Sequence, residues 1–316
     1  MDILIDISEE KIRSLGDDIL KILLFDRTTR RNIIWATDNY TIYGDSYSAK
    51  FPITIMQITG DNSNIIQPRV TKEKDEQLAR TKEKAEVFTP SWICNIQNNL
   101  IDAQWFGREG VFNSVEHTKW ISTTDKICFP DDKTHTWQKY VDEKRLEITC
   151  GEAPYLVSRY DSVTGKYIVV EERIGLLDRK LRIVNENNDD IENWYKWARR
   201  AFQSVYGFEY QGDSLLLARE NLLYTFIDNF EKKFGKHPTH EMLKEIATII
   251  SWNVWQMDGM TFTVPFQGIY QQYHQIMIDE LLEISDANDK KCYCKIKDWR
   301  SKKTEFYYAL IQKESE

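Results

Sequence analysis

The apolar positions of the chain predict one helix near its start and three helices in its second half. Residues 8–24 form an amphipathic pattern that Ser8 can cap, and its apolar stripe consists of Ile12, Leu15, Ile19 and Leu23. The same spacing of apolar positions recurs later in the chain. These later helices are expected over residues 193–206, 214–234 and 239–249.

Shorter runs of β-branched and aliphatic residues predict strands. They cover residues 32–36, 51–59, 146–149, 167–170 and 173–177. In the second half of the chain strands alternate with helices, which is typical of a mostly parallel twisted sheet with helices on both faces. The expected fold class is therefore α/β, and such sheets bind ligands at the carboxyl ends of their strands.

No linker rich in Gly, Ser or Pro divides the chain, so the expected domain boundary depends on a change of pattern. Residues 70–86 are highly charged, and we place the boundary near residue 80. Residues 1–80 are expected to form a small N-terminal α+β region. Residues 81–316 are expected to form the larger domain, ending in basic strands over residues 290–303.

The composition is that of a compact globular protein. The 316 residues are 41% hydrophobic and 29% charged, with 13 Gly and 7 Pro, which excludes disordered and collagen-like proteins. The mean hydropathy of −0.54 and the acidic first residues predict neither a membrane anchor nor a secretory signal. We therefore expect a cytoplasmic protein without a membrane partner, whose five scattered cysteines are free thiols.

The net charge of −8 argues mildly against a protein that coats nucleic acid, but the basic residues are unevenly distributed. Between Lys290 and Lys303 seven basic residues accompany a single acid, Asp298. A smaller basic cluster near the amino end consists of Arg27, Arg30 and Arg31. Each cluster fits either a nucleic-acid contact or an ordinary solvated strand face.

Three segments place small or acidic residues at a strand end. Residues 147–156 lead into a turn where Gly151 and Ala153 would let a ligand approach backbone N–H groups. Asp178 ends an apolar run 27 residues after Gly151, where a ribose-binding acid would stand. Asp213 precedes a long helix and could accept a hydrogen bond from an adenine amino group. The alternatives are an ordinary strand-to-helix turn and acids that only cap helices.

A fourth segment, residues 249–259, brings two Trp, an Asn, a Gln and an Asp to the end of an apolar run. Amide groups donate and accept hydrogen bonds and Trp offers a flat face, so the segment suits a pocket for an extruded nucleobase; a core Trp pair is the alternative. No metal site is expected. Cys292 and Cys294 have no second pair nearby, and His237 and His240 lack the H-E-x-x-H arrangement.

In this order the segments resemble the adenine-N6 DNA methyltransferases of restriction–modification systems, specifically the proteins described as restriction endonuclease subunit M. The resemblance covers about residues 20–300. Residues 85–90 look like the family's G-x-x-[FY]-T-P segment, and residues 147–153 look like its [DE]-P-x-C-G-x-G loop. The resemblance implies a Rossmann-like fold and S-adenosylmethionine (SAM) as the cofactor.

The resemblance also implies roles for individual residues. Asp178 would bind the ribose of SAM, and Asp213 would bind its adenine amino group. The full set of implied cofactor-binding residues is Phe88, Thr89, Pro90, Glu147, Cys150, Gly151, Ala153, Asp178 and Asp213. The implied catalytic tetrapeptide is Asn253, Val254, Trp255 and Gln256. In the family, the Asn and the next carbonyl accept hydrogen bonds from the target amino group and an aromatic ring stacks on the flipped base.

The tetrapeptide departs from the family's N-P-P-[YF], and Ala85 and Ala153 replace glycines. The expected function is a SAM-dependent methyltransferase acting on adenine N6 in double-stranded DNA, without a metal. A restriction or specificity subunit is a further expected partner. The alternatives are a SAM- and DNA-binding subunit without turnover, and a methyltransferase of RNA or protein.

Overall fold

A parallel three-stranded sheet lies at the centre of the structure, a computed structural model that describes residues 5, 7–72, 89–267 and 291–314. Its strands lie side by side in the order β5 (Arg145–Glu147), β6 (Val205–Glu209) and β7 (Val254–Gln256). Leu146 pairs with Tyr206, and Phe208 with Trp255. All residues of β6 and β7 are buried, as expected where a parallel sheet is covered on both faces.

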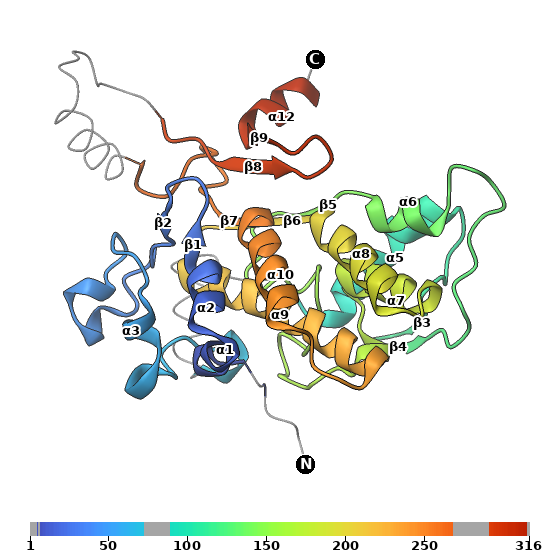
Figure 1. Ribbon diagram of the computed structural model, residues 1–316, viewed down its shortest axis with the longest axis horizontal. Coiled ribbons are helices and arrows are strands. Elements are labelled where there is room, and N and C mark those ends of the chain that lie inside the picture. Colours follow the sequence, from blue (N-terminus) through green and yellow to red (C-terminus); the bar gives the residue numbers. More distant parts are fainter. Residues whose placement is uncertain (1–4, 6, 73–88, 268–290, 315–316) are drawn as a thin grey trace.

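Three helices cover one face of this sheet: α8 (Ile191–Gln203), α9 (Gly212–Phe234) and α10 (His240–Asn253) (Figure 1). Val205 and Val254 belong to the hydrophobic core on this side. In α8 the spacing of three to four residues gathers a buried stripe of Trp194, Ala198, Ala201 and Phe202. Most of α9 is buried, so this helix forms the centre of the core.

The opposite face is covered by a hairpin of β8 (Lys295–Asp298) and β9 (Lys303–Phe306), followed by α12 (Tyr307–Glu314) (Figure 1). Alternate residues of a strand point to opposite faces, so Tyr206, Phe208 and Trp255 face this side. They pack in a second hydrophobic cluster with residues that include Ile296 and Tyr307.

The N-terminal part lies against the carboxyl ends of β6 and β7. It contains α1 (Glu9–Leu15), α2 (Asp17–Leu24), β1 (Phe25–Asp26), β2 (Arg31–Asn32) and α3 (Ile55–Ile58). Gln256 accepts from the Ile34 N–H at 2.9 Å and donates to the Ile34 carbonyl at 2.9 Å. The Gly212 N–H donates to the Trp35 carbonyl at 2.9 Å. A single hydrophobic core therefore contains residues from both sides of residue 80.

The remaining described elements surround this centre. The helices are α5 (Ser91–Phe106), α6 (Trp137–Asp142) and α7 (Leu176–Asn187), and a second hairpin joins β3 (Asn113–Glu116) to β4 (Lys119–Ser122). Short 3-10 helices occupy Thr41–Tyr43, Asp45–Tyr47, Gly60–Asn62, Arg69–Thr71 and Val170–Glu172. Within the described ranges, no helix combines the length and the apolar character that crossing a membrane requires.

The expected mixed α/β class and its parallel sheet are confirmed, although the described sheet is small. The expectation of helices on both faces is not met in the described residues, because the β8–β9 hairpin and α12 cover the second face. The helices expected over residues 214–234 and 239–249 correspond to α9 and α10. The helix expected over residues 8–24 is in fact two helices, because Gly16 adopts φ +142° and separates α1 from α2. Ser8 caps α1 as predicted.

Several strand predictions are wrong. Residues 173–177 are not a strand, because α7 begins at Leu176. Residues 51–59 contain α3, and residues 167–170 contribute only an isolated bridge. The strand β6 was missed, because its apolar residues continue the pattern of the helix expected over residues 193–206; α8 ends before it and Ser204 follows as the C-cap.

Candidate functional site

The turn that follows β5 has an unusual backbone. Thr149, Gly151 and Ala153 have φ values of +48°, +53° and +64°. Positive φ is costly for residues with a Cβ, and above all for a β-branched residue such as Thr149. Strain of this kind gathers at binding sites, where the surrounding structure holds the backbone in place. Here the Cys150 N–H donates to the Phe208 carbonyl at 2.8 Å, which fixes the turn to β6.

Glu209, the last residue of β6, lies beside this turn. Its Oε2 accepts from the Gly151 N–H at 2.9 Å, and its Oε1 accepts from the Gln211 N–H at 3.1 Å. Burial raises the pKa of Glu209, while the hydrogen bonds from neighbouring backbone N–H groups lower it. Each carboxylate oxygen can accept more than one hydrogen bond, so Glu209 retains capacity for ligand hydroxyl groups.

Glu147, the last residue of β5, fixes the far end of the same loop. Its two oxygens accept from the backbone N–H groups of Tyr155 at 3.2 Å and Leu156 at 3.1 Å. Burial raises the pKa of Glu147 to about 8, although these two donors act in the opposite direction. Glu147 therefore shapes the loop.

Thr89 and Pro90 lie near this loop as well. Pro90 immediately precedes α5, and the Thr89 carbonyl accepts from the Ser162 hydroxyl at 2.7 Å. The Tyr155 hydroxyl bonds to Gln97 on the same helix. Phe88 lies outside the described residues. The structure thus brings Thr89, Pro90, Glu147, Cys150, Gly151 and Ala153 to one edge of the sheet.

Asp213 begins the first turn of α9, just beyond the carboxyl end of β6. It is fully buried, and its Oδ2 accepts from the Tyr40 hydroxyl at 2.7 Å and pairs with the Lys72 ammonium at 3.5 Å. The charge of Asp213 contributes to the raised pKa of Glu209. Its predicted contact with an adenine amino group stays a prediction.

Asp178 does not lie at a strand end, and this assignment is corrected. It lies in the first turn of α7 and accepts from Ser158 N–H at 2.8 Å and from Gly175 N–H at 3.1 Å. Burial raises the pKa of Asp178, and the nearby Arg173 opposes this shift. Asp178 therefore caps a helix, the alternative that the sequence left open.

The tetrapeptide Asn253, Val254, Trp255 and Gln256 does not form a site with Gly151. Asn253 is buried at the amino end of β7, whereas Gly151 lies beyond the carboxyl end of β5. The Asn253 amide donates to the carbonyls of Phe202 and Val205, and its oxygen accepts from the Trp299 indole N–H at 2.7 Å. Val254, Trp255 and Gln256 form the buried strand itself. Their assignment as catalytic residues is corrected to a structural role.

Two further acids lie at strand ends: Glu209, which was not recognised from the sequence, and Asp258, the acid of the segment over residues 249–259. Glu209 ends β6, and its signal was the apolar Val205–Phe208 run before it. Asp258 follows β7, is partly exposed, and its Oδ1 accepts from the Met260 N–H at 2.9 Å. The carboxyl ends of the three described strands therefore carry Glu147, Glu209 and Asp258.

The edge formed by these acids and the Gly151 turn is the candidate site. Comparison with known proteins adds no relative: no family model, no curated protein and no solved structure matches the chain.

Proposed function

We propose that the chain is a SAM-dependent methyltransferase that transfers a methyl group to the N6 amino group of adenine in double-stranded DNA. The observation that carries the proposal is the strained Gly151 turn, hydrogen-bonded to an acid at the end of the neighbouring parallel strand. A small-residue turn next to a strand-end acid is the arrangement by which parallel α/β sheets hold a nucleoside. The sequence resemblance supports SAM as that nucleoside and a Rossmann-like fold.

In this proposal Glu209, and not Asp178, accepts hydrogen bonds from the two ribose hydroxyl groups. Gly151 lets the cofactor approach the backbone because it carries no side chain. The methyl group would pass in one step from the sulfonium to the adenine nitrogen, leaving a thioether, and the amino group would release a proton to water. Protein groups contribute by positioning the two reactants.

Calorimetry with purified protein tests the site directly. The substitution Glu209→Gln should weaken SAM binding by about 1 to 3 kcal/mol, the range for losing a charged hydrogen-bond partner. Glu241→Gln makes the same change at an exposed position and should leave binding intact. Asp178→Asn should lower stability without changing SAM affinity. Equal affinity in the Glu209→Gln variant and the wild type would show that the site lies elsewhere.

One observation favours a second candidate, a SAM- and DNA-binding subunit without turnover. Asn253 is buried and its amide nitrogen and oxygen both bond inside the protein, so its side chain is not presented to a target base. Incubation with methyl-labelled SAM and mixed-sequence duplex DNA separates the two. Label in DNA supports the enzyme, whereas SAM binding without transfer supports the subunit.

A further inference from the structure

The two basic clusters of the sequence meet in the fold. Arg27 and Arg30 belong to the turn between β1 and β2, and Lys295 begins β8. The Lys295 N–H donates to the Thr28 hydroxyl of that turn at 3.0 Å, across a separation of 267 residues. In Figure 1 the turn between β1 and β2 lies beside β8. Chain segments from opposite ends of the sequence thus form one surface.

Aromatic rings lie within this surface. The Arg27 guanidinium lies 5.6 Å from the centre of the Trp252 ring, and the Lys297 ammonium lies 5.8 Å from the same ring. Lys297 also lies 4.3 Å from the centre of the Trp299 ring. We call this surface the basic face and define it by Arg27, Arg30, Arg31, Lys295, Lys297, Trp252 and Trp299.

Two acids near the basic face accept hydrogen bonds from backbone N–H groups of their own turns. Asp26 is buried and accepts from the Thr29 N–H at 2.8 Å within its own turn. Asp298 accepts from the Arg300 N–H at 2.8 Å in the turn after β8. Among the residues that the structure describes, none forms an ion pair with Arg30, Lys295 or Lys297.

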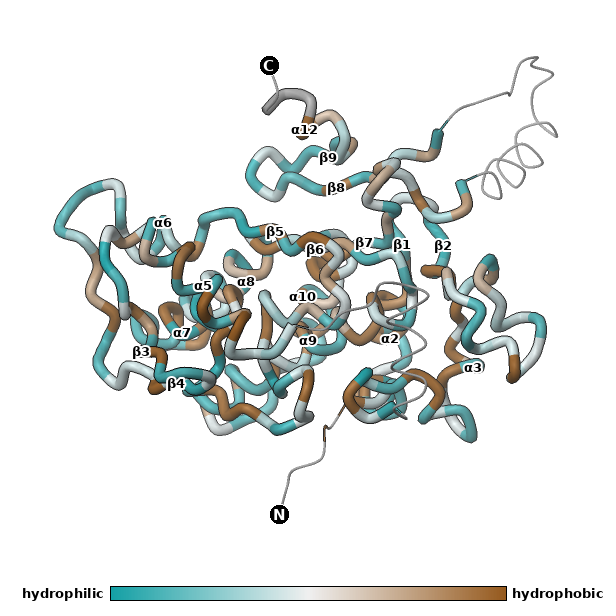
Figure 2. The backbone as a smooth tube through the Cα atoms, turned by 180° about the vertical axis from the view of Figure 1, so that it is seen from behind, coloured by the Kyte–Doolittle hydropathy of each residue, from teal (hydrophilic) through white to brown (hydrophobic). Residues whose placement is uncertain are grey.

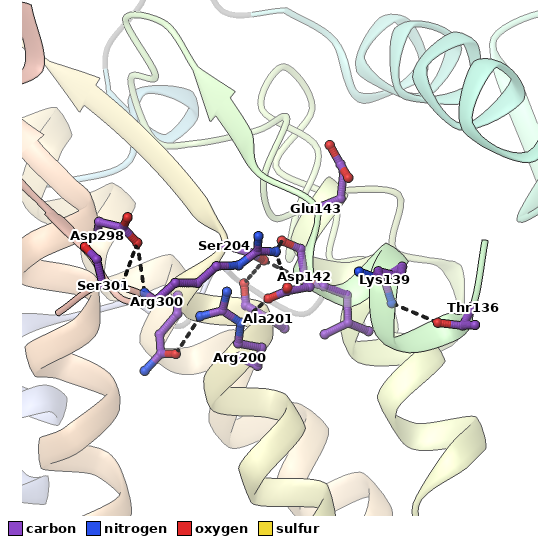
Figure 3. Close-up of polar contacts among 12 residues, drawn as sticks. Thr136, Lys139, Asp142, Glu143, Arg200, Ala201, Ser204, Asp298, Arg300 and Ser301 are labelled. Carbon is purple, nitrogen blue, oxygen red and sulfur yellow. Dashed lines mark hydrogen bonds and ion pairs between the residues drawn. The ribbon is translucent and has the colours of Figure 1, made fainter. Parts of the chain in front are cut away.

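Other contacts hold the hairpin that carries Lys295, Lys297 and Trp299 of the basic face. Figure 3 shows Arg300 reaching Asp142, which also accepts from Arg200 on α8. The Trp299 indole donates to Asn253 at the end of α10. Figure 2 shows hydrophilic positions around the turn that joins β8 and β9. These contacts hold the backbone of the hairpin in place, and with it the positions of Lys295 and Lys297.

We propose that the basic face binds the phosphate backbone of duplex DNA. Arg30, Lys295 and Lys297 form no ion pair among the described residues. Cations of this kind release counterions from DNA when they meet its phosphates, and this release drives such binding. Arg and Lys over Trp faces add contacts to the sugar and phosphate edge without reading sequence. The choice of DNA over other polyanions rests on the proposed function. The face lies along the β7 side of the sheet, away from the Gly151 turn.

The proposal is tested with the full-length protein and a 30-base-pair DNA duplex. Fluorescence anisotropy measures the affinity at several salt concentrations. The triple variant Arg30→Gln, Lys295→Gln, Lys297→Gln should lower the slope of log affinity against log salt by about 3, since each lost phosphate contact removes about 1. Near 0.1 M salt its affinity should fall on the order of 100-fold. The matched control removes three exposed lysines elsewhere: Lys119→Gln, Lys166→Gln, Lys236→Gln.

The proposal holds if the triple variant loses slope and affinity while the control keeps both. It fails if wild type and triple variant bind alike, if the control loses as much, or if wild type does not bind the duplex. Tighter binding of an equal length of duplex RNA also overturns it. SAM calorimetry on the same samples separates the two claims. If the triple variant loses salt slope but the wild type does not bind SAM, only the proposed function fails. If the triple variant keeps its DNA affinity and still transfers methyl groups, only the proposal for the basic face fails.

Discussion

Two buried carboxyl groups, Glu9 of α1 and Glu220 of α9, are costly features at the scale of single residues. Their exposed fractions are 1% and 0%, and none of their four oxygens has a hydrogen-bond partner. Burial raises the pKa of Glu9 from its ordinary 4.5 to about 8. Burial, and then the charge of Glu9, raise the pKa of Glu220. Both groups are therefore favoured in the protonated form in the folded protein.

This arrangement predicts a stability that declines as the pH rises. The unfolded chain releases the Glu9 proton near pH 4.5 and the folded protein only near pH 8, so the free energy of unfolding falls through that window. The raised pKa of Glu220 acts in the same direction. The neutral Glu220→Gln should exceed the wild type in stability at pH 8 by about 1 to 3 kcal/mol, with no gain at pH 4.5. Urea unfolding at both pH values measures this, with Glu241→Gln as the exposed control. An equal gain at both pH values would contradict the prediction.

The acid proposed to bind a ribose shows how far single residues could be predicted. The sequence correctly identified the small-residue turn, because Gly151 and Ala153 stand out locally. The choice of Asp178 assumed a simple unit with about 20 residues between turn and acid. Loops, α7 and α8 instead separate the Gly151 turn from Glu209, which lies 58 residues further on. Spacing alone cannot find an acid when the connection is that long.

At the scale of elements, Asp142 joins α6, α8 and the hairpin of β8 and β9. It receives the guanidinium groups of Arg200 and Arg300 (Figure 3). The substitution Asp142→Asn removes a charge that is only 20% exposed and leaves Arg200 without its anionic partner. We expect a loss of about 1 to 2 kcal/mol in urea unfolding, and faster amide exchange in β8 and β9. Asp131→Asn, at an exposed position, is the control, and unchanged exchange in the hairpin would contradict this role.

Helices were easier to predict than strands for a physical reason. The helices α9 and α10 are amphipathic or buried over several turns, so their period is visible in the sequence. The strands β5 and β7 have three residues each, too few to show any period. The strand β7 follows α10 directly, so in the sequence its Trp255 and Gln256 stand at the end of an apolar run. This position suggested a pocket rather than a buried strand. The buried Gln256 amide is satisfied by hydrogen bonds to the Ile34 backbone. This contact spans 222 residues, so no local pattern reveals it.

At the scale of the whole molecule, Gly212 controls how the N-terminal part meets the sheet. A Cβ at this position would lie 2.0 Å from the Ile34 carbonyl oxygen, a backbone atom that cannot move alone. Gly212 also donates its N–H to Trp35. Because one hydrophobic core contains residues of both parts, we expect them to unfold together.

Hydrogen exchange on the Gly212→Ala variant tests this coupling. The Ile53 amide reports on the N-terminal part, where it donates to the Ile33 carbonyl, and the Met257 amide reports on the sheet, where it donates to the Glu209 carbonyl. Overpacking should lower the exchange free energy of both amides by the same amount, about 1 to 3 kcal/mol. If the Ile53 amide alone became less protected, the N-terminal part would open by itself and the shared core would not be one cooperative unit.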